Sequence, residues 1–229
     1  MGKRLLEQKT RIDTERRYTP REALELLKEL DGANFDESVE VHVNLNVDPR
    51  RADQMVRGTL MLPNGTGKAR RVAVFAAGEK AREAEEAGAD VVGSEDLATR
   101  IRNEGFMGFD VAVATPDQMR IVGPLGQVLG PRGLMPNPKS GTVTMEVGRA
   151  VGDIKRGKIE YRVDRYGIIH GVIGKKSFGI DSLVENYFAV REELQRVRPA
   201  PVKGRYFKSV SLTTTMGPAI RVDPTVDTD

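Results

Sequence analysis

Cysteine and tryptophan are absent from the 229 residues, and histidine occurs only at His42 and His170. Without cysteine the chain can form no disulfide, thiolate nucleophile, iron–sulfur cluster or Cys-ligated zinc site. Two histidines are also too few for a histidine-rich metal cage. We therefore expect no metal and no other cofactor, and most classes of metalloenzyme are excluded.

Long apolar runs are missing as well. No stretch approaches the ~20 apolar residues that span a bilayer, and the basic start of the chain lacks the apolar segment of a secretory signal. The charges nearly balance, with 36 Lys and Arg against 33 Asp and Glu, and apolar residues make up 39% of the chain. We expect a folded cytoplasmic protein with no membrane contact.

The two ends of the chain share one texture, in which apolar and polar residues alternate. The alternation predicts strands with one buried face over residues 38–47, 158–163, 168–173, 206–215 and 219–222. The second and third of these flank a turn at 164–167 and are expected to form a hairpin. Helices are expected from Pro20, behind a capping Thr19, and from Leu183 to Val197.

Residues 68–156 read differently, because short continuous apolar runs alternate there with helical stretches, as in a parallel sheet covered on both faces. Within them, Gly and Pro occupy 9 of the 19 positions at 123–141, which predicts an ordered loop or a mobile flap. We expect an α/β protein of two domains joined by a double hinge. The domains are a discontinuous α+β domain, 1–67 with 157–229, and an inserted three-layer, Rossmann-like α/β domain, 68–156.

Motifs for catalysis and nucleotide binding fail on inspection. The stretch Gly65-Thr66-Gly67-Lys68 lacks the Walker glycine at position 62 and the hydroxyl at position 69. The first strand of the inserted domain is followed by no glycine cradle for pyrophosphate. Neither histidine has a Ser and Asp pattern beside it, so we interpret both as surface or packed residues. A small-molecule or nucleotide-binding α/β enzyme stays open as an alternative, as does a purely structural interaction protein.

The last long strand carries the most informative polar pattern. Its hydroxyl groups share one face: Ser209, Ser211, Thr213 and Thr215. Hydroxyls suit ribose 2′-hydroxyls and phosphate oxygens. The net charge is +3 for residues 157–229, against −1 for 1–67 and +1 for 68–156. Aromatic residues that could stack on bases stand in the same segment: Tyr166, Tyr206 and Phe207. A polyanion is the expected partner.

Six segments give a more specific indication: FDESVE at 35–40, DPRR at 48–51, VRG at 56–58, LGPRGLMPNPK at 129–139, GIIH at 167–170 and TTTMG at 213–217. Together they resemble the bacterial large-subunit ribosomal protein L-one family, the proteins of the mobile ribosomal stalk, over nearly the whole chain. The resemblance implies the same split architecture and no enzymatic activity. It also implies a structural place in the large ribosomal subunit.

The resemblance further implies binding to large-subunit ribosomal RNA, chiefly through the first domain, and help in releasing deacylated tRNA from the exit site. Repression of translation through a similar site on the protein's own messenger RNA is implied too. The family's RNA contacts carry over to Phe35, Ser38, Glu40, Asp164, Arg165, Ser209, Thr215, Met216 and Gly217.

We expect particular roles for some of these residues. Thr215 would hydrogen-bond ribose or phosphate, and Gly217 would allow close approach of the backbone to RNA. Phe35 and Met216 would supply apolar contact. Glu40 would orient its neighbours or accept a hydrogen bond from a 2′-hydroxyl.

Overall fold

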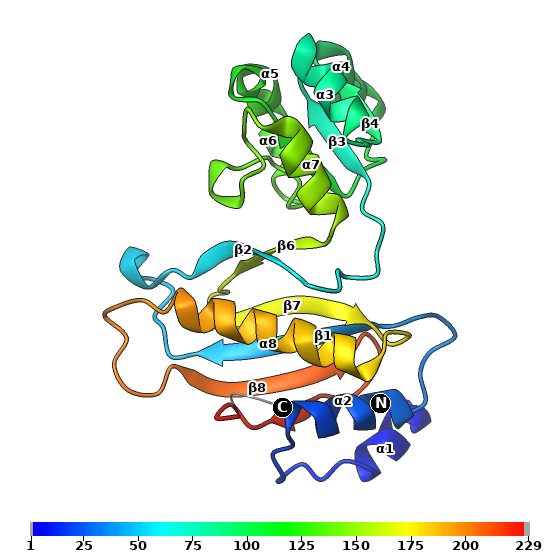
Figure 1. The fold of residues 1–229 in the computed structure, drawn as a ribbon, viewed down its shortest axis with the longest axis vertical. Helices are drawn as coiled ribbons and strands as arrows, with labels where there is room; N and C mark the ends of the chain where they lie inside the picture. Colours follow the sequence, from blue (N-terminus) through cyan, green and yellow to red (C-terminus); the bar gives the residue numbers. More distant parts are fainter. Residues whose placement is uncertain (1, 227–229) are drawn as a thin grey trace. The chain divides into compact units, whose positions relative to one another are not determined.

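The computed structural model describes residues 2–226, which divide into two compact units (Figure 1). The first unit runs up to Gly67 and resumes at Ile159, and the second is Lys68–Lys158. The second crossing thus follows Lys158, where the sequence predicted it after residue 156. Both units mix helices with sheets, which confirms the α/β class. No helix in residues 2–226 is both long and apolar enough to cross a bilayer.

A four-stranded antiparallel sheet in the order β7-β1-β8-β9 organises the first unit. Its strands are β1 (Ser38–Leu45), β7 (Ile168–Lys175), β8 (Phe207–Thr214) and β9 (Ile220–Val222). Burial along the central strand β1 alternates strictly, with Val39, Val41, Val43 and Leu45 at most 3% exposed. The period-2 pattern of the sequence therefore becomes a sheet with one face in the core.

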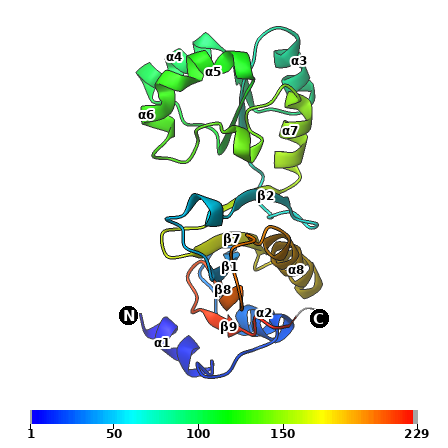
Figure 2. The same cartoon turned by 90° about the vertical axis from the view of Figure 1, so that its left-hand side faces the viewer.

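Two helices, α2 (Pro20–Glu29) and α8 (Ile180–Arg196), cover that buried face, and Figure 2 shows both on the same side of the sheet. Helix α2 begins with the expected capping box between Thr19 and Glu22, a feature worth about 1 kcal/mol. Leu24, Leu27 and Leu183 from the helices join the inward residues of β1 and β8 in one core. The other side of β1, β7 and β8, which we call the open face, carries the polar residues Ser38, Glu40, His42, Asn44, His170, Ser209, Ser211 and Thr213 and the apolar residues Ile168 and Val172, all of them partly or fully exposed.

The expected hairpin is wrong in its pairing, although both of its strands exist. The turn forms, with the Asp164 N–H donating to the Ile168 carbonyl at 2.8 Å. However, β6 (Lys158–Arg162) pairs with β2 (Arg57–Met61) in a separate two-stranded sheet, and β7 pairs with β1 from Ser38↔Lys175 to Asn44↔Ile168. Turn chemistry fixes a local reversal of the chain, but burial of the apolar side of β7 beside β1 decides the partner.

The second unit is a three-stranded parallel sheet between two helical layers, as the sequence predicts. The strand order is β4-β3-β5, with β4 (Val91–Gly93), β3 (Val72–Phe75) and β5 (Val111–Ala114). Val72 and Val74 pack against α3 (Glu79–Glu86) and α7 (Val147–Lys155), whereas Ala73 and Phe75 pack on the side of α4 (Glu95–Glu104), α5 (Met119–Val122) and α6 (Gly126–Leu129). Every residue of β3 is completely buried.

The two ends of the Gly- and Pro-rich segment 123–141 form short helical turns, and a turn and loop at 130–137 connect them. They comprise η3 (Gly123–Leu125), α6 and η4 (Pro138–Ser140), and Leu125 and Leu129 are at most 1% exposed. Burial of these two leucines attaches the first part of the segment to the core of the second unit. The sequence patterns did not indicate α1 (Lys3–Thr10), α7 or the turn η1 (Ala52–Gln54). A helical start at Thr115-Pro116 is expected from the sequence, and η2 (Pro116–Gln118) begins there.

Candidate nucleic-acid interface

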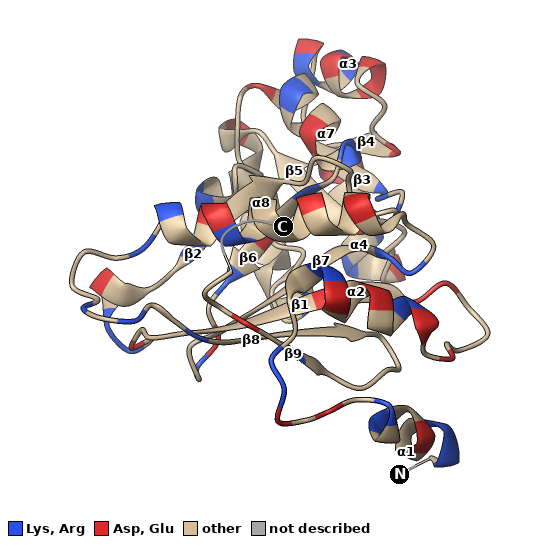
Figure 3. Ribbon diagram, turned by 60° about the horizontal axis from the view of Figure 1, so that its bottom comes forward, with Lys and Arg blue, Asp and Glu red and all other residues tan. Residues whose placement is uncertain are grey.

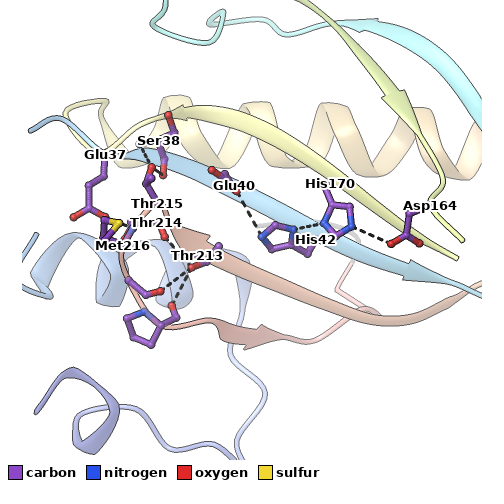
Figure 4. A network of polar contacts seen from close by, with 12 residues as sticks. Glu37, Ser38, Glu40, His42, Asp164, His170, Thr213, Thr214, Thr215 and Met216 are labelled. Atoms are coloured by element: carbon purple, nitrogen blue, oxygen red, sulfur yellow. Dashed lines mark hydrogen bonds and ion pairs between the residues drawn. The ribbon is translucent and has the colours of Figure 1, made fainter. Parts of the chain in front are cut away.

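The predicted RNA contacts all lie in the first unit, at the two ends of β1 and between them. Phe35, Ser38 and the segment 215–217 lie at the start of β1, whereas Asp164, Arg165 and Ser209 lie near its end. Asn44 lies six positions after Ser38 along the strand, a distance of about 20 Å at ~3.3 Å per residue. Glu40 lies between the two groups on the same face (Figure 4).

At the start of β1, Thr215 is bound to Ser38 through backbone and side chain. The Thr215 hydroxyl accepts from the Ser38 N–H at 3.0 Å, and the Thr215 N–H donates to the Ser38 carbonyl at 3.1 Å. The Ser38 hydroxyl in turn accepts from the Lys175 ammonium at 3.1 Å. The Thr215 O–H also donates to the Ser38 carbonyl, at 3.4 Å. The hydroxyl of Thr215 therefore already fixes the end of β8 to β1, and only acceptor capacity remains for RNA.

Gly217 is required by the protein's own packing. A Cβ atom at this position would lie 2.3 Å from the Thr214 hydroxyl oxygen, far inside van der Waals contact. Thr214 is buried and cannot swing into solvent. The close approach expected between Gly217 and RNA thus has an internal counterpart, because the turn after β8 closes only without a side chain here.

At the far end of β1, Asp164 holds the turn before β7. One carboxylate oxygen accepts from the N–H groups of Tyr166 and Ile168, each at 2.8 Å. Burial alone raises the pKa of Asp164, but these two hydrogen bonds and the nearby His170 outweigh it, so the pKa is lowered. The turn displays Tyr166, 68% exposed, with the Arg165 guanidinium 4.8 Å from its ring centroid. An exposed ring with a cation over it can stack on a base.

A row of four titratable side chains crosses the open face between the two ends of β1 (Figure 4). The Nδ1 atoms of His42 and His170 lie 2.8 Å apart, His170 Nε2 lies 3.4 Å from Asp164, and His42 Nε2 lies 3.8 Å from Glu40. At 2.8 Å one Nδ1 must donate and the other accept. Burial, aided by the charge of His170, lowers the pKa of His42 against the opposing effect of Glu40. This row of side chains can therefore bind a proton, but protonation of the accepting Nδ1 would break the hydrogen bond between the two histidines.

Some of the aromatic and basic residues near the carboxyl end of the chain are exposed, and others support the fold. Tyr206 and Phe207 are at most 8% exposed, so their expected stacking role is wrong; their side chains belong to the core. Arg198 donates to the carbonyls of Val202 and Gly204, which ties down the loop before β8. Acidic bands mark α2 and α8 in Figure 3, whereas the strands of the sheet are largely tan. The side of the sheet with the helices is thus the less favourable one for a polyanion.

The second unit offers no comparable surface at the carboxyl ends of its strands, where ligands bind in parallel α/β sheets. The Ser94 hydroxyl there donates to Gln118 at 2.6 Å, and buried Thr115 lies against the carbonyl of Phe75. These polar groups satisfy one another. Across residues 2–226 no cluster of three or more His, Asp and Glu could hold a metal ion.

Sequence reasoning missed the contact between the two histidines and the importance of Glu37. His42 occupies an outward position of β1, as the alternation predicts, but only the register with β7 places His170 beside it. Glu37 lies just before β1, is 1% exposed, and is contacted by residues from both ends of the chain. A charged residue before a strand normally reads as solvated, and no local pattern signals such burial.

Comparisons with known proteins agree with the sequence resemblance. The family described as "Ribosomal protein L1p/L10e family" matches residues 27–218. The large ribosomal subunit protein uL1 of Rubrobacter xylanophilus is 81% identical over 226 residues, which cover 99% of this chain and 98% of that protein. The matched residues include the open face and the segment 214–217.

Proposed function

This chain belongs to the ribosomal protein L1p/L10e family, and from that premise we propose that its open face binds large-subunit ribosomal RNA. The chain is a structural constituent of the large ribosomal subunit and not an enzyme. As part of the ribosome it resides in the cytoplasm. The proposal concerns which surface binds RNA and what the bound protein does.

The observation that carries the proposal is that one side of an antiparallel sheet is left without helices and displays hydroxyl, imidazole and carboxamide groups, with the Glu40 carboxylate among them. Ser209 and Ser211 stand opposite Asn44 and His42 in the β1–β8 register, so these donors and acceptors form rows across the strands. Such groups pair with ribose hydroxyls and phosphates, and a flat sheet face can lie along an RNA strand. Exposed Arg165 and Lys208 at the margins supply positive charge.

We assign the contacts to Phe35, Ser38, Glu40, Asp164, Arg165, Ser209, Thr215, Met216 and Gly217. Two kinds of role are proposed among them. Ser209 and Arg165 contact RNA directly, since both are exposed. Asp164 and Thr215 act largely by holding the backbone that RNA meets, because their oxygens already accept from N–H groups.

The finer functions follow from a place in the stalk. We propose that the bound protein assists release of deacylated tRNA from the exit site. We also propose that it represses translation of its own messenger RNA by binding a site there that resembles the ribosomal one. Both functions need the same open face, so ribosomal and messenger RNA should compete for it.

Filter binding of the full chain to a stalk fragment of ribosomal RNA tests the proposal. We expect structure-specific affinity that falls as salt rises, because phosphate contacts release counterions. A leader fragment of the messenger should compete for the same protein, whereas random RNA of equal length should not. Equal affinity for stalk and random RNA would overturn the proposal.

A further inference from the structure

Glu37 is a buried carboxylate that joins two loops from opposite ends of the chain. Its side chain is 1% exposed and lies between residues 33–36, which precede β1, and residues 214–217, which end β8 and turn toward β9. One oxygen accepts from the Ala33 N–H, and the other accepts from the Met216 N–H at 3.1 Å. A third hydrogen bond comes from the Thr214 side chain. A single carboxylate thus sets the spacing of both loops.

The charge of Glu37 is stabilised where it lies. Burial by itself raises the pKa of this carboxyl, but the hydrogen bonds from Thr214, Ala33 and Met216, with the positive charge of Lys176, together lower it. The group is therefore ionised at neutral pH. Lys176 is held in place because its ammonium also donates to the Leu30 carbonyl and its backbone N–H donates to the Glu37 carbonyl.

The two loops that Glu37 joins each display one large apolar side chain. Phe35 is 55% exposed and Met216 is 53% exposed. The loop before β1 has one further tie, because the Asp36 carboxylate accepts from the N–H and hydroxyl of Ser177. Because Glu37 bonds both loops, these two side chains stand on neighbouring segments and can contact the same ligand.

Glu37 cannot touch a ligand, because almost none of its surface is accessible. An accessible carboxylate at this place would also repel phosphate. Its chemistry is instead that of a fixed acceptor for two backbone N–H groups. Loss of the carboxylate would leave the Ala33 and Met216 donors without that partner and would free the loops to move apart.

We propose that Glu37 is a positioning residue for RNA recognition, holding Phe35 and Met216 at the separation needed to contact one RNA site. This role rests on the proposed function of the open face. It differs from the assigned contacts because Glu37 acts only through the two loops. Removing Glu37 should therefore cost nothing further once Phe35 and Met216 have been truncated.

The test measures affinity of the full chain for the stalk RNA fragment in a double-mutant cycle. We expect Glu37→Ala to weaken binding at least tenfold. Glu37→Gln, which keeps one acceptor oxygen, should give an intermediate loss. In a Phe35→Ala/Met216→Ala background, adding Glu37→Ala should change the affinity less than twofold. Glu22→Ala is the matched control, since Glu22 also accepts a backbone N–H, from Thr19 at 3.0 Å, but lies on α2; its RNA affinity should equal that of the wild type.

A second readout uses the free protein. The Met216 amide should lose protection from hydrogen exchange, and its methyl group should become more mobile, in Glu37→Ala but not in Glu22→Ala. Equal losses of affinity in both backgrounds, or wild-type affinity of Glu37→Ala, would overturn the positioning role while leaving the proposed function in place. Absence of specific binding by the wild type would instead overturn the proposed function, and the positioning role with it.

Discussion

The four-stranded sheet of the first unit and the three-stranded sheet of the second differ in how many of their faces are covered by helices. In the second unit β3 is sealed between helical layers, and its four residues have no exposed surface. In the first unit, β1 buries every second residue, and the others form an open face with polar partners all along β8 and, on β7, at Lys175 and His170. A sheet covered by helices on both sides has no face left to contact a ligand. A sheet covered on one side has a face free to bind.

The largest expected effect comes from separating the units. A protein of residues 68–158 alone should show no preference for stalk RNA over random RNA, whereas specific complexes typically exceed non-specific ones by ~10³-fold or more. The first unit, with Gly67 joined to Ile159 by a short linker, should fold and bind the fragment within about threefold of the full chain. Specific affinity of the 68–158 protein for stalk RNA would contradict the view that only the first unit has an RNA-binding face.

Gly217→Ala should have the next largest effect, because the new Cβ would clash with the Thr214 hydroxyl. Such overpacking costs about 1–3 kcal/mol of stability, and the displaced turn should weaken RNA binding roughly tenfold. Gly171→Ala on β7 is the control, since its Cβ would meet only the Val41 side chain, at 3.8 Å. Urea unfolding and filter binding measure both quantities. If the two variants behave alike, packing at Gly217 is not what shapes the surface.

Thr215→Val should lower RNA affinity about fivefold, equivalent to ~1 kcal/mol, because the Ser38 N–H loses its side-chain acceptor. The second unit offers a matched bond, in which the Thr144 hydroxyl accepts from the Glu146 N–H at 3.1 Å. Thr144→Val should cost similar stability and leave RNA affinity unchanged. A loss of RNA affinity in Thr144→Val would show that the second unit contributes to binding.

The smallest effect is a pH dependence that belongs to the first unit alone, since it holds both histidines. The folded state lowers the pKa of His42, so the unfolded chain binds a proton on acidification, near pH 6.5, before the folded one does. Stability should therefore fall as pH drops below about 6.5, until the folded-state pKa is passed. His42→Gln should show a smaller fall between pH 7 and 5 in urea unfolding. An identical fall would mean that the histidine pair is not strained by protonation.

The sequence revealed the faces of the strands more reliably than their partners. Alternation placed His42 and Ser209 outward and Val41 inward, and the capping box at Thr19 fixed the start of α2. These are local properties with a period or a motif. The pairing of β7 with β1, by contrast, depends on burial between segments more than a hundred residues apart, which no local motif encodes.

The same limit explains what was missed at the surface. Family resemblance identified Phe35 and Met216. The role of Glu37 becomes visible only in the fold, where its carboxylate accepts from the N–H groups of residues 33 and 216. Tyr206 and Phe207 were expected to stack on bases, because an aromatic residue near basic ones looks alike whether it faces water or the core. Burial of a particular side chain is decided by the packing of the whole unit.

Mapping the RNA footprint on the intact protein tests the central claim most directly. On addition of the stalk RNA fragment, we expect the NMR signals of open-face residues and of 164–166 and 214–217 to shift, while those of α2, α8 and residues 68–158 stay in place. Shifts confined to the helices or to the second unit, with the signals of β1 and β8 unchanged, would contradict it.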